Sequence, residues 1–273
     1  SDLADVNGHT YTYLANGHTA AQNWTGIFAP GERVRLRFIN GAAMTFFDVR
    51  IPGLKLTVVA ADGQPIQPVE IDEFRIAPAE TYDVIVQPMD AVAYTVFAQA
   101  MDRSGYTRIT LAPQIGMQAA IPMPDKRPLL TMDDMGHGGH AMDKAGEMTC
   151  GAAMGMPAME GMAGMTHGSA MQTHPASETR NPDVDMQTMA PVPKLDDPGI
   201  GLRNNGRSVL RYADLHSLHA PADDREPSRT IELHLTGNME RFTWGFDGIR
   251  FSDAAPIRLK YGERMRLVLI NDT

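Results

Sequence analysis

A ten-residue segment occurs twice in this chain, and it has the pattern of a β-strand. Residues 31–40 read GERVRLRFIN and residues 262–271 read GERMRLVLIN, so seven of the ten positions are identical. In the first copy Val34, Leu36 and Phe38 alternate with three arginines, which is the two-residue period of a strand with one buried face. A chain with two such segments is constrained to place each in a β domain of the same kind.

The repeat extends beyond this segment at the same spacing. Asn16-Gly17 corresponds to Asp247-Gly248, and both dipeptides are turn signals. The aromatic residue Tyr13 corresponds in the same way to Trp244. Because these features share one offset, we infer that two β domains of one kind begin in this chain. The alternative is that a common strand-and-turn pattern occurs twice.

The part of the chain up to residue 113 has an all-β pattern. Short runs rich in β-branched and aromatic residues are separated by turn signals at Pro30-Gly31, Pro52-Gly53 and Asp62-Gly63. Strands at this spacing, without a long amphipathic helix, predict a sandwich or a barrel. We expect strands at 33–40, 46–51, 55–60, 70–76, 82–86, 94–98 and 107–111, and again at 209–212, 230–235, 242–246, 257–260 and 265–270.

The middle of the chain, from about residue 114 to 194, has a different composition. Twelve of the nineteen methionines lie between Met132 and Met189, and no Phe, Tyr or Trp occurs between Tyr106 and Tyr212. Such a segment cannot bury enough apolar surface to offset the entropy lost on ordering it. We therefore predict a long, flexible, methionine-rich insert between two β domains. The predicted divisions are 1–113, 114–194 and 195–273.

The insert carries side chains of the kinds that bind copper. Thioether sulfurs select Cu(I), and a glycine-rich backbone lets several of them meet at one ion. Imidazole suits Cu(II), and His137 and His140 form a His-x-x-His pair next to Met135. The interleaved Gly and Ala make a poor hydrophobic core, so the remaining alternative is an inert linker. The candidate metal ligands are Met135, His137, His140, Met154, Met156, Met159, Met162, Met165 and His167.

The single cysteine and the other histidines are weaker candidates. Cys150 does not lie in a His-Cys-His run, so it is either a thiolate ligand of Cu(I) or a solvated free thiol. His174 lies in the insert, and a role as a secondary ligand stays open. A surface-loop or structural role is favoured for the remaining histidines: His9, His18, His216, His219 and His234.

The bulk composition excludes several classes of protein. A formal net charge of −9 argues against a nucleic-acid partner, because phosphate binding needs a basic face. No run of about 18 apolar residues is present, so the sequence predicts no membrane span. One cysteine cannot make an internal disulfide framework. The sequence also contains no nucleophile elbow, phosphate loop or zinc spacing.

Several short motifs occur in order along the whole chain. They are Tyr11-Thr12-Tyr13-Leu14, Gly31-Glu32-Arg33, residues 77–84 (APAETYDV), Tyr212-Ala213-Asp214-Leu215 and Trp244-Gly245-Phe246-Asp247-Gly248. Each motif alone is weak. In this order, and together with the Met/Gly/His insert, they resemble the copper-resistance protein A family, which comprises bacterial periplasmic multicopper oxidases related to laccases.

The resemblance implies an architecture of three cupredoxin-like, Greek-key β-sandwiches in the parent protein. Copper ligands in this family come from histidine runs of the first and third domains. Residues 1–113 then match the complete middle domain, which carries no ligand, and residues 195–273 match the opening strands of the third. The histidine run of the third domain is expected shortly after Asn271, so this chain is expected to lack the catalytic copper ligands.

The function that the resemblance implies is oxidation of Cu(I) or phenolic donors, with reduction of dioxygen to water by the parent oxidoreductase. The chain alone is expected to be inactive. Copper is the implied cofactor, and the implied partners are copper ions and the flanking cupredoxin domains of the same polypeptide. The implied compartment is the periplasm. The alternative is a non-catalytic periplasmic protein that binds and buffers copper.

Overall fold

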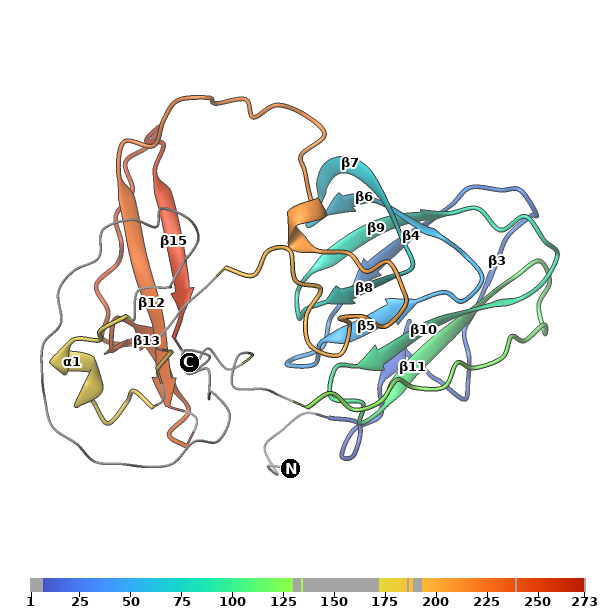
Figure 1. The fold of residues 1–273 in the computed structure, drawn as a ribbon, viewed down its shortest axis with the longest axis horizontal. Helices are drawn as coiled ribbons and strands as arrows, with labels where there is room; N and C mark the ends of the chain where they lie inside the picture. Colours follow the sequence, from blue (N-terminus) through green and yellow to red (C-terminus); the bar gives the residue numbers. More distant parts are fainter. Residues whose placement is uncertain are drawn as a thin grey trace, which may run out of the picture. The chain divides into compact units, whose positions relative to one another are not determined.

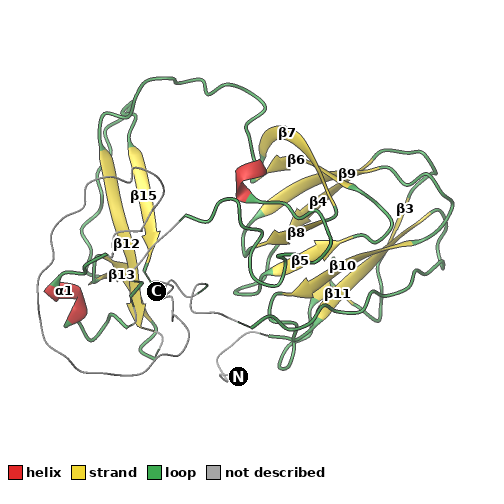
Figure 2. Ribbon diagram, in the orientation of Figure 1, coloured by secondary structure: helices red, strands yellow, loops and turns green. Residues whose placement is uncertain are grey.

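A computed structural model describes residues 7–129, 134, 172–185, 187–188, 193–238 and 240–272. Among these residues, helical structure is confined to α1 (Ala176–Thr179) and the 3-10 turn η1 (Tyr212–Asp214), as Figure 2 shows. The all-β prediction is therefore confirmed. The chain forms two compact units. Unit 1 comprises Ser1–Leu129 and Lys194–Ala222, and unit 2 comprises Leu130–Pro193 and Asp223–Thr273.

Unit 1 is a sandwich of two sheets, as expected for a cupredoxin-like domain (Figure 1). One sheet has the strand order β3-β11-β10-β5-β8, and the other has the order β4-β9-β6-β7. The first sheet consists of β3 (Thr25–Ile27), β11 (Tyr106–Ala112), β10 (Tyr94–Ala100), β5 (Phe47–Arg50) and β8 (Glu73–Ile76). The second consists of β4 (Val34–Ile39), β9 (Thr81–Val86), β6 (Leu56–Ala61) and β7 (Gln64–Ile71). A separate hairpin joins β1 (Leu14–Ala15) to β2 (His18–Thr19).

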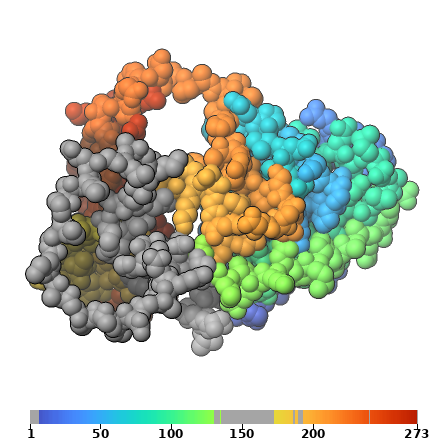
Figure 3. Space-filling model, viewed as in Figure 1, coloured from blue at the N-terminus to red at the C-terminus, as the bar shows by residue number. Residues whose placement is uncertain are grey.

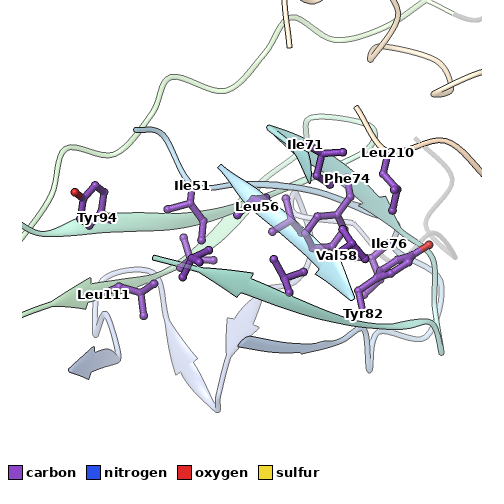
Figure 4. Close-up of a cluster of buried hydrophobic side chains, with 14 of the residues drawn as sticks. Ile51, Leu56, Val58, Ile71, Phe74, Ile76, Tyr82, Tyr94, Leu111 and Leu210 are labelled. Atoms are coloured by element: carbon purple, nitrogen blue, oxygen red, sulfur yellow. The ribbon is translucent and has the colours of Figure 1, made fainter. Parts of the chain in front are cut away.

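The core lies between these sheets, and Phe74 is one of its fully buried side chains (Figure 4). The ring of Phe74 is fully buried and makes edge contacts with two other aromatic rings. Its centroid lies 5.1 Å from that of Phe38 in β4 and 5.3 Å from that of Tyr82 in β9. Alternate residues of each strand point into this space, as the period-2 pattern requires. Burial also raises the pKa of the Tyr82 hydroxyl above its ordinary value, and the nearby Glu80 carboxylate adds to this effect.

The predicted strand at 70–76 is two strands that belong to different sheets. β7 ends at Ile71 and β8 begins at Glu73, so the chain crosses from one sheet to the other at Asp72. The backbone of Asp72 is hydrogen-bonded to a loop and not to a neighbouring strand: its N–H donates to the Ser208 carbonyl at 2.8 Å. Its carboxylate accepts a bond from the Ser208 N–H at 2.9 Å. The prediction of one continuous strand was therefore wrong.

Two other predicted strands are absent from the described residues. In the segment 209–212, Val209 makes only an isolated bridge to Glu73, and the chain then turns into η1. The segment 257–260 corresponds by the repeat to residues 26–29, part of which is β3. In unit 1, β3 is held by parallel pairing with β11, and the given sequence does not extend to a counterpart of β11.

Residues 194–222 return to unit 1 after the methionine-rich part of the chain (Figure 3, orange). Leu202 and Leu210 of this return segment are buried, and the Leu210 N–H donates to the Glu73 carbonyl at 2.9 Å. The compact units therefore divide the chain differently from the predicted boundary at residue 195. That boundary remains a prediction about the evolutionary domains.

A buried carboxylate, Glu73, attaches the return segment to the sheet. Its side chain is fully buried and pairs with Arg50 of β5 at 3.3 Å and with Arg207 at 2.6 Å. Asp125, from the stretch that follows β11, also contacts Arg50, at 3.1 Å. These pairs order parts of the chain on both sides of the insert, including residues that the composition assigned to the flexible region. We call Arg50, Glu73, Asp125 and Arg207 the Glu73 network.

Unit 2 contains one four-stranded sheet in the order β14-β13-β12-β15. Its strands are β12 (Thr230–Asn238), β13 (Thr243–Phe246), β14 (Ile249–Arg250) and β15 (Arg266–Asn271). β12 is antiparallel to β13 and parallel to β15. The sheet therefore contains the strand that the sequence repeat predicted at 265–270, with its start shifted by one residue.

The structure reproduces the internal repeat in detail. The turn residues Asn16 and Gly17 have φ values of 49° and 75°, and Asp247 and Gly248 have values of 54° and 74°. The two hairpins also share one register, since the pair Ala15↔His18 corresponds to Phe246↔Ile249. Both turns need positive φ at two successive positions, which explains why Asn or Asp followed by Gly occurs at both.

Replacing Glu73 by alanine is expected to lower the free energy of unfolding of unit 1 by about 3–5 kcal/mol. The reason is that Arg50 and Arg207 would lose the buried carboxylate that compensates their charges. Urea unfolding followed by Trp24 fluorescence, in a Trp244→Phe background, measures this change.

Glu70→Ala is the matched control, because Glu70 is exposed on β7. We expect its effect to stay within about 0.5 kcal/mol. If both variants unfold at the same urea concentration, the Glu73 network does not have the structural role described above.

Candidate functional site

The principal candidate copper ligands predicted from the sequence lie outside the described residues, whereas the secondary candidate His174 is described. The principal candidates are Met135, His137, His140, Met154, Met156, Met159, Met162, Met165 and His167, and Cys150 lies outside as well. The described residues do show where the chain goes directly after this stretch. Residues 172–185 and 187–188 pack within unit 2.

Backbone hydrogen bonds attach this segment to the sheet of unit 2. The Asp185 N–H donates to the Gly237 carbonyl at 2.8 Å, and the Thr188 N–H donates to the Asp272 carbonyl at 2.8 Å. The Asn181 side-chain amide donates to the Gly248 carbonyl at 2.7 Å. We call residues 172–185 and 187–188 the docking segment. These residues of the predicted flexible insert are thus held along β12 and at the end of β15.

Two histidines lie beside the buried carboxylate of Asp272, which directly follows β15. His234 Nδ1 is 2.7 Å from Asp272 Oδ2, and His174 Nδ1 is 3.8 Å from the same oxygen. The Asp272 side chain is fully buried, and the His174 side chain is 4% exposed. The other carboxylate oxygen, Asp272 Oδ1, is buried and has no hydrogen-bond partner in the described part of the chain.

Glu178 and Gln187 complete the surroundings of His174. His174 Nε2 is 2.8 Å from the Thr188 carbonyl, which can only accept, so Nε2 carries a proton. The Gln187 amide lies 3.0 Å from His174 Nδ1 and donates to Glu178 Oε2 at 2.8 Å. We call the following residues the His174 cluster: His174, Glu178, Gln187, His234 and Asp272.

His234 has an acidic partner at each ring nitrogen. Nδ1 faces Asp272 at 2.7 Å, and Nε2 faces Glu232 Oε1 at 3.2 Å. Partial burial disfavours the charged ring and lowers its pKa. The hydrogen bonds and charges of Asp272 and Glu232 outweigh that effect, so the pKa of His234 lies above its ordinary value. The carboxylates of Asp272 and Glu232 therefore stabilise the protonated form of the His234 ring relative to its neutral form.

The cluster has donor types that suit Cu(II), since imidazole nitrogens and carboxylate oxygens both do so. Its polar atoms, however, are largely engaged with one another and with backbone carbonyls. Among the residues that the structure describes, no group of three or more His, Cys, Asp or Glu side chains is arranged to hold a metal ion. The arrangement fits a hydrogen-bonded clasp that holds the docking segment against the sheet of unit 2.

From the sequence, His174 was a possible secondary ligand and His234 a structural residue, whereas Glu178, Gln187 and Asp272 had no predicted role. No local signal could have found them, because Asp272 and His174 are 98 positions apart (272 minus 174). The surface-loop interpretation of two other histidines is confirmed, because His216 and His219 are exposed.

Comparison with known proteins assigns the class. The sequence profile of the family described as "Cu-oxidase: Multicopper oxidase" matches residues 2–121, which include most of unit 1. The sandwich of unit 1 and the repeated hairpin of unit 2 agree with the cupredoxin-like domains of that class. Residues 2–121 thus match a multicopper oxidase domain.

Relatives narrow the class to one family. Copper resistance protein A of Escherichia coli is 60% identical over 100% of this chain and 49% of its own length. A copper resistance protein A homolog of Pseudomonas syringae pv. tomato is also 60% identical, over 100% of this chain and 48% of its own length. The multicopper oxidase MmcO of Mycobacterium tuberculosis is 35% identical over 96% of this chain and 36% of its own length.

This chain belongs to the copper-resistance protein A family, and copper is the cofactor of that family. It spans about half the length of the first two relatives. The resemblance inferred from the sequence motifs is thus confirmed. No helix among the described residues is both long and apolar enough to cross a membrane.

The pKa of His234 in the folded chain is expected to exceed about 6.5, the ordinary value for histidine. Its contribution to the stability of unit 2 is then fully present below about pH 6.5 and is lost as the pH rises through the folded pKa. NMR titration of the His234 ring measures this pKa directly.

Asp272→Asn should move the His234 pKa down, because the variant removes one of the two facing charges. The same titration of the unsubstituted chain is the reference. A His234 pKa that does not fall in the Asp272→Asn variant would contradict the electrostatic assignment.

Proposed function

We propose that the parent of this chain is a periplasmic copper oxidase that oxidises Cu(I) or phenolic donors and reduces dioxygen to water. In this proposal the chain itself supplies no catalytic copper ligand. Its role is to collect Cu(I) on the methionine-rich insert and to hold that insert close to the end of β15. The periplasm is the compartment that the family resemblance implies.

The observation that carries this proposal is the clasp at the C-terminal end of the insert. Gln172 is the first residue described after the methionine-rich stretch, and its side-chain amide lies 3.0 Å from His234 Nδ1. The same ring nitrogen contacts Asp272, which follows β15 directly. Gln172, which follows the thioether-rich stretch in the sequence, therefore lies beside the ring that contacts Asp272, close to the position where the family resemblance expects a histidine run.

The chemistry of the insert supports collection of the cuprous ion in particular. Five methionines stand at spacings of two or three residues in a glycine- and alanine-rich stretch, from Met154 to Met165. Soft thioethers prefer Cu(I) to Cu(II), and they bind without any proton being released. Small neighbours leave the backbone free to bring several sulfurs to one ion.

The second candidate function is copper buffering without catalysis. It rests on the same methionine-rich composition of the insert. Both candidates require the insert to bind Cu(I), and they differ in whether bound copper is passed on to be oxidised. Kinetics of the complete parent protein separates them.

Changing Met154, Met156, Met159, Met162 and Met165 together to serine in the complete parent is expected to lower the rate of cuprous oxidation. We expect this rate to fall by about tenfold or more, because removing groups that support a metal site typically lowers metal affinity or activity by about 10- to 100-fold. Oxidation of a phenolic donor, which does not need the insert in this proposal, should stay within about twofold of the unsubstituted enzyme.

The matched control is Met89→Ser with Met123→Ser, because both side chains are exposed and lie outside the methionine cluster that runs from Met132 to Met189. Cu(I) affinity is measured in parallel by competition with a colorimetric cuprous chelator. If the five-serine variant loses its affinity for Cu(I) but oxidises Cu(I) at an unchanged rate, the buffer function is favoured over delivery of copper for oxidation. Unchanged affinity would reduce the insert to a linker and refute both candidates.

A further inference from the structure

A buried arginine on the outer face of the first sheet of unit 1 has no counter-charge among the described residues. Arg108 of β11 is 7% exposed, and its Nε and Nη1 atoms are buried without a hydrogen-bond partner. Ile109 and Leu111 of the same strand pack into the core, so the alternation of a strand places Arg108 on the opposite face of the sheet. Because arginine does not lose its proton in proteins, the position holds a permanent cation.

Other arginines that contact this face have a counter-charge. In four of them the guanidinium lies 2.6–3.3 Å from a fully buried carboxylate, which is Glu73 for Arg50 and Arg207 and Asp48 for Arg75 and Arg103. A charge taken out of water without a partner is strongly destabilising. Arg108 therefore needs a negative group that the described residues do not supply, and such an orphaned group indicates a bound ion or water.

Arg50 and Arg108 allow a direct comparison, because they flank the same residue. Phe97 of β10 pairs with Arg50 of β5 on one side and with Arg108 of β11 on the other. The Arg50 guanidinium lies over the Phe97 ring, 4.9 Å from its centroid, and it also pairs with Glu73 and Asp125. The two arginines thus share an aromatic neighbour in the sheet, and they differ in their counter-charge.

A second donor without a partner belongs to Asn23. The parallel pairing of β3 with β11 through Thr25↔Thr110 places position 23 beside position 108. The Thr110 hydroxyl, which leaves β11 on the same face as Arg108, donates to Asn23 Oδ1 at 2.9 Å. This bond orients the Asn23 amide, whose nitrogen donates to no residue in the part of the chain that the structure describes.

The site is also accessible from solvent. The third guanidinium nitrogen of Arg108, Nη2, is not among the fully buried atoms that lack a partner, and no described residue accepts a hydrogen bond from it. Solvent therefore reaches the guanidinium at Nη2, and a small ion can enter there.

We propose that Arg108 and Asn23 bind a small monovalent inorganic anion of the halide class, such as chloride, on the outer face of unit 1. One uncompensated guanidinium matches one negative charge, which favours a monovalent ion over a dianion. Guanidinium and amide nitrogens offer only N–H donors, and a halide only accepts. The ion supplies to Arg108 what Glu73 supplies to Arg50, and its role is to stabilise unit 1.

The chloride dependence of unfolding tests this proposal on the 273-residue chain, with Trp244→Phe so that Trp24 fluorescence reports on unit 1. Replacing sodium gluconate by sodium chloride at constant ionic strength should raise the thermal midpoint by about 3 °C, because only the folded state binds the ion. Arg108→Gln should abolish this response. Arg37→Gln is the matched control, since the Arg37 side chain is 70% exposed, and it should keep the response.

NMR of the arginine side chains gives a second readout that needs no substitution at the site. The Nε–H signal of Arg108 should shift during a chloride titration and reach a plateau, as binding at one site requires, whereas that of Arg37 should not saturate.

Two results would overturn the proposal. One is an Arg108 Nε–H signal that does not respond to chloride, which would leave water as its partner. The other is an equal effect of chloride on the thermal midpoints of Arg108→Gln and Arg37→Gln, which would make the response a general effect of salt.

Discussion

The fold of unit 1 depends on one buried charge, the carboxylate of Glu73. A carboxylate removed from water is strongly destabilising unless cations and hydrogen-bond donors surround it. The sheet alone supplies one cation, Arg50, and the second, Arg207, comes from the return segment more than 130 positions away. The Glu73 carboxylate therefore gains its second cationic partner only when the return segment packs against unit 1.

The same principle operates a second time on the same sheet. Asp48 of β5 is fully buried and pairs with Arg75 of β8 at 2.7 Å and with Arg103 at 2.7 Å. Arg75 also donates to the Ile200 carbonyl at 2.7 Å, so this ion pair too reaches the return segment. The outer face of the sheet thus carries specific polar contacts where a simple sandwich would carry a solvated surface. Those contacts attach the stretch after β11 and the return segment, which lie on the two sides of the insert in the sequence, to the same sheet of unit 1.

The strands themselves were readable from the sequence because they depend on local alternation. The run at 33–40 alternates cleanly, and β4 occupies Val34–Ile39. The switch at Asp72 was not readable, since Glu70–Ile76 contains no Gly or Pro turn signal and the backbone bonds of Asp72 are made with Ser208, far along the chain. The His174 cluster was hidden for the same reason, because its members come from the docking segment, β12 and the end of β15.

The repeat carried more information than composition did. It predicted two domains of one kind, and the hairpins agree even in the φ values of their turn residues. Composition, by contrast, assigned residues 114–194 to one flexible segment, although Asp125 and His174 are both held by specific side-chain contacts. Average properties describe a segment as a whole and cannot show which of its residues find partners elsewhere.

The central claim is that the methionine-rich stretch binds Cu(I) while its C-terminal end is clasped to unit 2. The most direct measurement is NMR of the chain with ¹³C-labelled methionine methyl groups during titration with Cu(I) under anaerobic conditions. The account predicts that the methyl signals of Met154, Met156, Met159, Met162 and Met165 shift together, while those of Met89 and Met123 stay in place. The account is contradicted if the methyl signals of the insert do not respond, or if Met89 and Met123 shift equally.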